Sequence, residues 1–248
     1  MIDVQCSMFN VQCSMFNVCI AMLCIGHRGA MGHEPENTLL SVKKAIALGA
    51  NGIEIDVYNV ENRLIVIHDH TLERTTNGTG YVEEQDFAYL RSLDAGKGEQ
   101  IPTLEEVFEV VNKQVLINIE LKGSNTARLV AELIQKYLKK GWSERDFVVS
   151  SFDHYQLNQV KLIEPRIKIG TLIYGLPWEY LTNAQKIGAK IVIPSLDYVS
   201  SDLVTAAHQQ ELLVWVYTVN LPSDIDRMRE LDVDGIFTNY PELVMSTK

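Results

Sequence analysis

Short apolar runs rich in β-branched residues alternate along most of the chain with stretches in which apolar residues recur every three or four positions. The short runs are typical of buried parallel strands, and the longer stretches are typical of amphipathic helices. The predicted strands are Cys19–His27, Gly52–Val57, Val115–Leu121, Phe147–Phe152, Ile167–Ile173, Ile191–Pro194, Leu212–Thr218 and Gly235–Thr238. The predicted helices begin near Asn37, Thr103, Thr126, His154, Glu179, Ser201, Pro222 and Pro241. This alternation predicts an α/β protein of the (β/α)8 or TIM-barrel class, since eight strands and eight helices close such a barrel.

The segment after the second predicted strand breaks this alternation. Leu64–Ile67 indicates an extra strand that pairs with the end of the second one, and the polar, turn-rich sequence Arg-Thr-Thr-Asn-Gly-Thr-Gly follows at 74–80. A long excursion inside a compact domain is usually a functional loop or subdomain. We therefore expect a small subdomain inserted at about 70–100, on the barrel face where active sites lie.

The 248 residues suit a single barrel, which we place at 18–248. The preceding extension, 1–17, contains the heptapeptide Val-Gln-Cys-Ser-Met-Phe-Asn twice, at 4–10 and 11–17. The repeat could form a short amphipathic helix, but we favour a small duplication without chemical function. Two copies are too few for a solenoid or a coiled coil.

Charge and cysteine distribution narrow the possible partners. The net charge of −10 argues against nucleic acid or an anionic membrane surface as the main partner. The longest apolar run, Val18–Ile25, is too short to span a bilayer, so we expect no transmembrane segment. All four cysteines lie within the first 24 residues, which indicates a reducing compartment and predicts a cytoplasmic location.

Three carboxylates occupy the carboxyl ends of neighbouring predicted strands. Glu54 and Asp56 are two residues apart and therefore point to one side of their strand, and Glu120 ends the next strand. Carboxylates that converge repel one another unless they are protonated or bridged by a cation. Their oxygen atoms suit a hard divalent ion, which predicts one Mg²⁺ or Ca²⁺ at this site. The alternative is a set of salt bridges from these acids to Arg28 and Lys122.

Two histidines end strands at the same rim. His27 and His68 are candidates for general acid and base catalysis because imidazole titrates near neutral pH, and their order is left open. Arg28 and Lys122 would supply the positive charge that binds a phosphate. The other histidines are assigned to structural or surface positions: His33, His70, His154 and His208.

A set of short motifs occurs in order between about residues 23 and 245. They are His27-Arg-Gly, Pro35-Glu-Asn-Thr, Glu54-Ile-Asp, His68-Asp, the turn-rich 74–80 sequence, Ile101-Pro-Thr-Leu-Glu, Glu120-Leu-Lys, Trp215-Val-Tyr-Thr-Val-Asn and Gly235-Ile-Phe-Thr-Asn-Tyr-Pro. Together these motifs resemble the glycerophosphodiester phosphodiesterase family. Each motif alone is weak, but their joint occurrence is highly specific.

The resemblance implies an enzyme that hydrolyses small glycerophosphodiesters or lysolipids to glycerol 3-phosphate and an alcohol. It implies the roles given above for the two histidines, the three acids, Arg28 and Lys122. Glu36 and Asn37 also belong to the family's motif as substrate-binding candidates, although Asn37 could equally cap the first helix. The chain departs from the family in having Tyr217 before Thr-Val-Asn where Trp is more frequent, so Tyr217 or Trp215 is expected to form the wall around the alcohol.

Two other functions compete with this interpretation. A sphingomyelinase D-type phospholipase has a similar fold and site, but those toxins are secreted and disulfide-linked, whereas the predicted barrel has no cysteine beyond Cys24. A barrel that binds phosphodiesters without turnover would need no pair of acid–base histidines.

Overall fold

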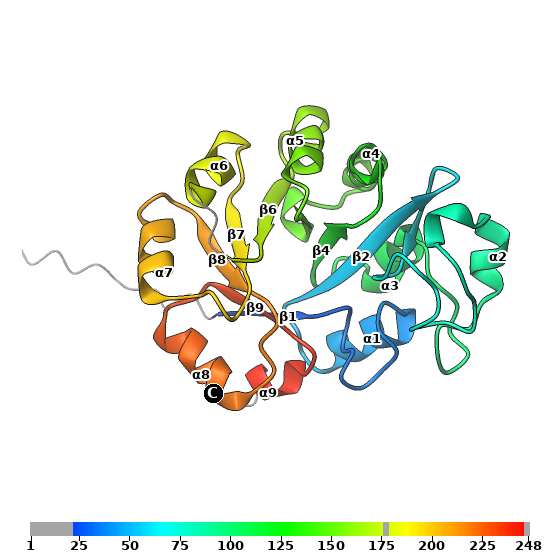
Figure 1. The fold of residues 1–248 in the computed structure, drawn as a ribbon, viewed down its shortest axis with the longest axis horizontal. Coiled ribbons are helices and arrows are strands. Elements are labelled where there is room, and N and C mark those ends of the chain that lie inside the picture. The colour runs from blue at the N-terminus through cyan, green and yellow to red at the C-terminus, as the bar shows by residue number, and fades with distance from the viewer. Residues whose placement is uncertain (1–21, 176–178, 246–248) are drawn as a thin grey trace, which may run out of the picture.

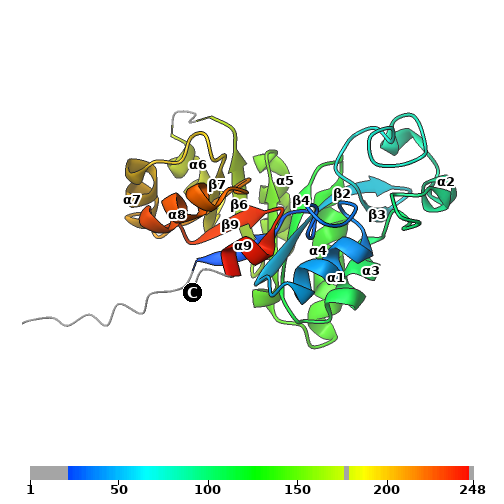
Figure 2. The same cartoon turned by 90° about the horizontal axis from the view of Figure 1, so that it is seen from below.

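Eight parallel strands form a closed barrel in the computed structural model, which describes residues 22–175 and 179–245 (Figures 1 and 2). Around the barrel the strands follow the order β1-β9-β8-β7-β6-β5-β4-β2, and pairing of β1 with β2 closes the ring. The strands are β1 (Leu23–Gly26), β2 (Gly52–Val60), β4 (Leu116–Leu121), β5 (Phe147–Ser151), β6 (Lys168–Ile173), β7 (Ile191–Pro194), β8 (Leu213–Val216) and β9 (Gly235–Thr238). The predicted (β/α)8 barrel is confirmed.

Helices surround the barrel as the sequence periodicity predicts (Figure 1). They are α1 (Leu39–Ala47), α3 (Leu104–Val111), α4 (Thr126–Lys139), α5 (His154–Ile163), α6 (Tyr180–Lys186), α7 (Ser201–His208), α8 (Pro222–Glu230) and α9 (Pro241–Met245). The 3₁₀ turn η2 (Glu144–Asp146) leads into β5. At α3, Thr103 and Glu106 form a capping box, in which each side chain accepts a hydrogen bond from the other's backbone N–H.

The start of the first helix differs from the prediction. Thr38, and not Asn37, caps α1, because the Thr38 hydroxyl accepts a hydrogen bond from the Ser41 backbone N–H. The capping role considered for Asn37 is therefore wrong. The first strand is also shorter than predicted: β1 begins at Leu23, and the part of the prediction before residue 22 lies outside the described residues.

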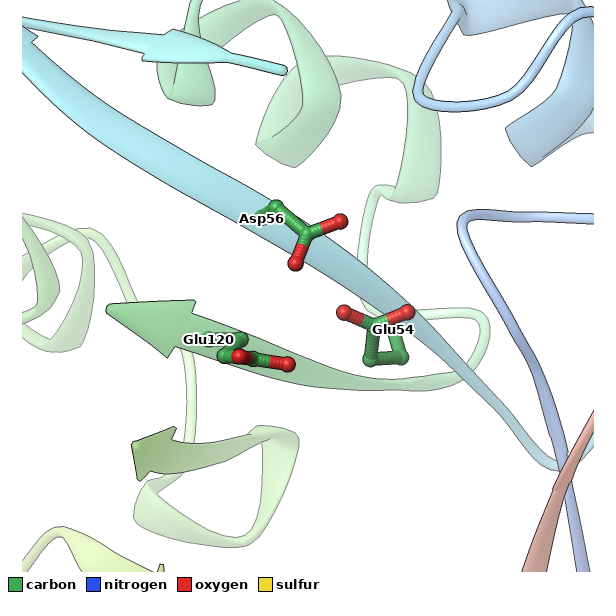
Figure 3. A group of neighbouring side chains, drawn as sticks. All are labelled: Glu54, Asp56 and Glu120. Atoms are coloured by element: carbon green, nitrogen blue, oxygen red, sulfur yellow. The ribbon is translucent and has the colours of Figure 1, made fainter. Parts of the chain in front are cut away.

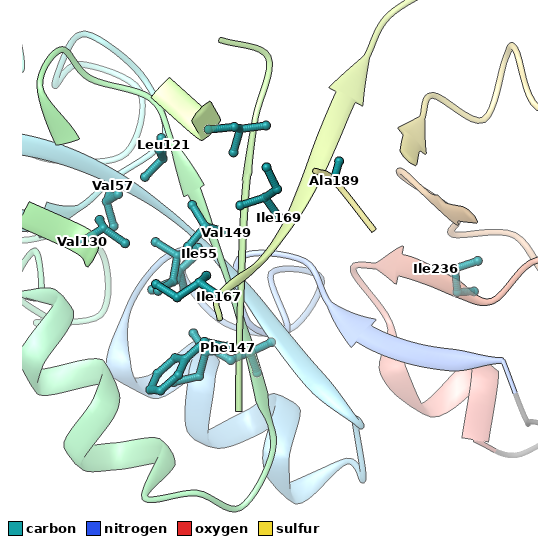
Figure 4. Close-up of a cluster of buried hydrophobic side chains, with 14 of the residues drawn as sticks. Ile55, Val57, Leu121, Val130, Phe147, Val149, Ile167, Ile169, Ala189 and Ile236 are labelled. Atoms are coloured by element: carbon teal, nitrogen blue, oxygen red, sulfur yellow. The ribbon is translucent and has the colours of Figure 1, made fainter. Parts of the chain in front are cut away.

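Alternation along the strands separates two kinds of packing. Outward-facing side chains of the strands pack against the helices in the main hydrophobic core, which includes Ile55, Val149 and Ile169 (Figure 4). A second cluster, which includes Ile25, Val148 and Trp215, fills the interior of the barrel. We call this interior cluster the apolar plug. Toward the carboxyl ends of the strands, the next inward-facing residues are polar: Glu54, Asp56, Asn118, Glu120 and Ser150. The polar layer therefore lies toward the carboxyl ends of the strands.

The inserted segment between β2 and α3 has a hydrophobic cluster of its own. β3 (Arg63–Val66) pairs antiparallel with the end of β2, as predicted, and is followed by the 3₁₀ turn η1 (Val82–Glu84) and α2 (Phe87–Ser92). Ile65, Leu72 and Leu90 are among the buried members of this cluster. The segment projects from one side of the barrel (Figure 2).

The duplicated heptapeptide of the N-terminal extension lies outside the described residues. Within the described part of the chain, none of the helices has both the length and the apolar character needed to cross a membrane.

Candidate active site

A cavity of about 350 Å³ opens at the carboxyl ends of the strands, and its two sides differ in chemistry. The side formed by β1, β2, β4 and the segment after β3 contributes charged and titratable groups: His27, Arg28, Glu54, His68, Glu120 and Lys122. The other side contributes apolar and aromatic groups: Phe152, Leu172, Tyr174, Tyr217 and Phe237. This arrangement suits a ligand with an anionic part and a less polar part.

The three predicted metal-binding carboxylates converge inside the barrel (Figure 3). Asp56 and Glu120 are directly opposite each other in the parallel pairing of β2 with β4, and Glu54 lies two residues earlier on the same face. One oxygen atom from each side chain lies within 4.8 Å of the others. The Glu54 and Asp56 residues are only 2% and 1% exposed, and Glu54 Oε1 and Asp56 Oδ1 accept no hydrogen bond from the described residues.

The electrostatics of this cluster favour a bound cation. Burial and then the neighbouring charges of Asp56 and Glu120 raise the pKa of Glu54 well above its ordinary value. Burial and the charge of Asp56 likewise raise the pKa of Glu120 to about 7. Buried carboxylate oxygens that lack donors fit a hard divalent ion, because such an ion would offset both their desolvation and their mutual repulsion.

Basic side chains contact the same carboxylates, so the salt bridges considered as an alternative are also present. Lys122 Nζ lies 2.6 Å from Glu120 Oε1, and Arg28 Nε lies 3.5 Å from Asp56 Oδ2. The Arg28 backbone N–H donates to Glu54 Oε2 at 2.8 Å. Both basic residues line the cavity, so they hold positive charge beside the acids and remain available to an anion.

The first histidine is held by a neutral partner. His27 Nδ1 lies 2.8 Å from the side-chain oxygen of Asn239, which follows β9. Because an amide oxygen only accepts hydrogen bonds, Nδ1 carries the proton and Nε2 is left as a proton acceptor. Burial and then the charge of Arg28 lower the pKa of His27 to about 4, so the ring is neutral at pH 7.

The second histidine is held by a carboxylate. His68 Nδ1 lies 2.7 Å from Asp69 Oδ1, and Asp69 in turn accepts from Arg74. Burial lowers the pKa of His68, and the carboxylates of Asp56 and Asp69 oppose this decrease. The hydrogen bond from Arg74 keeps the pKa of Asp69 below its ordinary range, so Asp69 is ionised and supports a proton on His68.

Glu36 and Asn37, which we predicted to bind substrate, are not among the residues that line the cavity. Glu36 Oε1 accepts from Arg28 Nη1 at 2.6 Å, and Asn37 Nδ2 donates to Asp56 Oδ2 at 2.9 Å. Arg28 and Asn37 both have a positive φ, of 51° and 59°. The motif thus holds the groups that face the cavity, and direct contact of Glu36 or Asn37 with substrate stays a prediction.

The aromatic wall is formed by Tyr217 and not by Trp215. Tyr217 lines the cavity, and its ring packs edge-on against Phe152 with centroids 5.9 Å apart. Trp215, two residues earlier on the same face, is 2% exposed and belongs to the apolar plug below. The predicted substrate contact of Trp215 is therefore withdrawn.

The histidines assigned to structural positions lie outside the cavity lining. His33 pairs with Glu242, His208 pairs with Asp234, and His154 bonds the Leu172 carbonyl. His70 stacks on Tyr81.

Sequence reasoning did not assign a role to Asn239, Asp69 or Arg74. Adjacency to His68 was a signal that could have identified Asp69, since a histidine used in acid–base chemistry is usually oriented by a neighbouring acceptor. No local pattern identifies Asn239, which lies 212 residues from His27 in the sequence.

Comparison with known proteins identifies a family and several relatives. The model of the glycerophosphoryl diester phosphodiesterase family matches residues 27–243. A glycerophosphodiester phosphodiesterase from Caldanaerobacter subterraneus is 38% identical over 237 residues, which cover 90% of this chain and 96% of that protein. One from Bacillus subtilis is 32% identical over 253 residues, which cover 92% and 86%.

Solved structures show the same fold. A phosphodiesterase from Oleispira antarctica, in complex with its product sn-glycerol-3-phosphate, superposes with a TM-score of 0.84 at 28% identity and covers 90% of this chain and 95% of its own. With matches that span nearly the whole barrel, the chain belongs to the glycerophosphoryl diester phosphodiesterase family and is a phosphoric diester hydrolase.

Proposed function

We propose that this barrel hydrolyses glycerophosphodiesters to glycerol 3-phosphate and an alcohol, with a divalent cation and two histidines as general acid and base. The observation that carries the proposal is that His27, His68 and two of the three carboxylates line one cavity beside Arg28 and Lys122. The product named for the Oleispira antarctica phosphodiesterase supports the choice of substrate.

Glu54, Asp56 and Glu120 would hold the cation, because their buried oxygens converge, and Glu54 Oε1 and Asp56 Oδ1 accept no hydrogen bond from the described residues. When bound, Mg²⁺ or Ca²⁺ would neutralise charge on the phosphoryl oxygens. Arg28 and Lys122 add positive charge at the same rim, which a phosphodiester needs because the net charge of the chain is −10.

The partners of the two histidines suggest different roles. His27 is neutral at pH 7 with its Nδ1 proton directed to Asn239, so Nε2 can accept the proton of the attacking hydroxyl group. Ionised Asp69 holds the Nδ1 proton of His68 and stabilises its imidazolium form, in which Nε2 carries a second proton that it can donate to the departing alcohol oxygen. The attacking hydroxyl belongs either to water or to the glycerol 2-position of the substrate.

Turnover of glycerophosphocholine tests the proposal directly. We expect glycerol 3-phosphate and choline to form with Mg²⁺ or Ca²⁺ and neither product to form in excess chelator. Binding without turnover under every metal condition would indicate the phosphodiester-binding barrel. Release of choline from sphingomyelin, without hydrolysis of glycerophosphocholine, would indicate the sphingomyelinase D type.

The cellular location stays a prediction. It depends on the position of the cysteines, of which the described residues contain only Cys24, buried and in the free form.

A further inference from the structure

One arginine of the inserted segment, Arg74, links the partner of His68 to the partner of Arg28. Arg74 contacts Asp69 through Nε at 2.5 Å and Nη2 at 2.9 Å. The same guanidinium contacts Glu36 through Nη1 at 2.6 Å and Nη2 at 2.8 Å. Arg74 therefore makes a bidentate contact with each of two carboxylates.

Each of these carboxylates holds a residue that lines the cavity. Asp69 accepts from His68 Nδ1 at 2.7 Å, and Glu36 accepts from Arg28 Nη1 at 2.6 Å. The five side chains form a continuous hydrogen-bonded chain from His68 to Arg28, with Arg74 at its centre. Arg74 itself does not line the cavity.

The turn-rich 74–80 sequence fixes the backbone that carries this arginine. Thr76 closes a turn, since its backbone N–H and its hydroxyl both donate to the Leu72 carbonyl. A Cβ at Gly78 would lie 2.5 Å from Leu93 Cδ1, so a larger residue would displace that side chain, and Gly80 has a φ of +96°, which favours glycine. Leu72 is fully buried in the cluster of the insert. The loop is thus anchored next to Arg74.

We infer that Arg74 is a positioning residue of the proposed reaction, which holds His68 and Arg28 in register with each other through Asp69 and Glu36. Without the guanidinium, each carboxylate loses a charge-assisted bidentate partner and keeps only its contact with His68 or Arg28, so its orientation is less restricted. Orientation of His68 would then no longer be coupled to the position of the phosphate held by Arg28. This inference rests on the proposed function, and it assigns a task to the inserted segment.

Replacement of Arg74 tests the inference. In Arg74→Ala, we expect kcat to fall at least about tenfold and KM to rise, because misplacement of reacting groups by about 1 Å can cost up to about 10²-fold in rate. Arg74→Lys should recover only a small part of this loss, since one ammonium group cannot bridge two carboxylates bidentately.

Two further variants test separately the contact of Arg74 with Asp69 and its contact with Glu36. Asp69→Asn should lower kcat with little change in KM, whereas Glu36→Gln should act mainly on KM through Arg28. Adding Arg74→Ala to Asp69→Asn should lower kcat little further, because both changes disrupt the same hydrogen-bonded chain that holds His68.

The matched control is Arg91→Gln. Arg91 also belongs to the insert and pairs with Glu106 at 2.7 Å, but it lies away from the cavity. It should change thermal stability without changing the ratio of kcat to KM. Equal kinetic losses in the Arg74 and Arg91 variants would overturn the inference, because they would show a general effect of the insert.

An activity-independent measurement distinguishes failure of this inference from failure of the proposed function. In ¹⁵N NMR spectra, Nδ1 of His68 in the unaltered protein should carry a proton that is hydrogen-bonded to Asp69, and Arg74→Ala should weaken that hydrogen bond and shift the Nδ1 signal. An unchanged His68 signal in Arg74→Ala would overturn the inference whether or not the protein turns over substrate. Absence of glycerophosphodiester turnover in the unaltered protein would contradict the proposed function alone.

Discussion

The imidazole of His27 and the amide oxygen of Asn239 are joined by a 2.8 Å hydrogen bond across the junction of β1 with β9. The backbone supports this contact, since the His27 N–H donates to the Thr238 carbonyl at 2.8 Å. Asn239 is fixed by its own N–H, which donates to Asn220 Oδ1. A neutral acceptor therefore orients His27 and stabilises its charged form less than a carboxylate, such as the one that orients His68, would.

Asn239→Asp should shift the pH dependence of the rate. A carboxylate on Nδ1 stabilises the imidazolium, so the pKa of His27 should rise from about 4. Protonated His27 cannot accept a proton, so the acid limb of kcat/KM should move to higher pH by about one pH unit or more. Activity near pH 5 should fall while activity near pH 8 is retained. The measurement is kcat/KM from pH 4 to pH 9.

Asn220→Asp is the control for that variant, because it adds the same charge one hydrogen bond farther from the imidazole. An acid limb that does not move in Asn239→Asp, or that moves equally in both variants, would contradict the role of His27 as proton acceptor.

Removal of the cation should abolish activity and lower stability together. A ligand that binds only the folded state at a hundredfold excess over its Kd stabilises that state by about 2.7 kcal/mol, so Mg²⁺ or Ca²⁺ should raise the melting temperature. Glu54→Gln and Asp56→Asn should each lose this metal-dependent increase as well as turnover. Glu132→Gln, which alters a surface ion pair, should retain both. Full turnover in excess chelator would rule out the cation site.

The two histidines should be individually essential and jointly non-additive. General acid–base catalysis contributes about 10²–10⁴-fold, so His27→Ala and His68→Ala should each lower kcat by at least about two orders of magnitude with smaller changes in KM. The double variant should be little worse than the worse single variant, because groups that act as a unit are not additive. His33→Ala, which removes a surface contact with Glu242, is the control. Near-normal kcat in either single variant would refute the two-histidine mechanism.

Tyr217 and Trp215 should respond differently to substitution although both belong to β8 and its extension. Tyr217→Ala removes a wall of the cavity. It should raise KM and change the free energy of unfolding only slightly. Trp215→Phe shrinks a buried side chain of the apolar plug and should lower the free energy of unfolding by roughly 1–3 kcal/mol. Urea unfolding and steady-state kinetics measure the two effects. A larger change in KM from Trp215→Phe than from Tyr217→Ala would contradict the placement of Tyr217 in the cavity wall and of Trp215 in the buried interior.

Prediction from sequence succeeded where the alternation of side chains along a strand decides which face a residue occupies. Glu54, Asp56 and Glu120 were placed on one face by alternation, and adjacent parallel strands then bring them together. It failed for Trp215, because alternation gives the face of a strand but not the depth, which depends on the stagger of strands around the barrel. The capping alternative considered for Asn37 is not realised, because Thr38 beside it is an equally competent cap. The contacts of Asn239 with His27 and of Arg74 with Glu36 join residues 212 and 38 positions apart, and no local periodicity encodes them.

Closure of the barrel between β1 and β9 has a consequence for how activity is acquired. His27 directly follows β1, the first strand described, and Asn239 follows β9, the last, so the proposed proton acceptor is oriented only after both ends of the barrel have met. A nascent chain that has emerged as far as β8 contains both histidines, all three carboxylates and Arg74, yet lacks the partner that selects the tautomer of His27. During refolding, turnover should therefore begin when β1 pairs with β9 and not at the earlier hydrophobic collapse of the chain. The appearance of activity would then measure the rate of barrel closure.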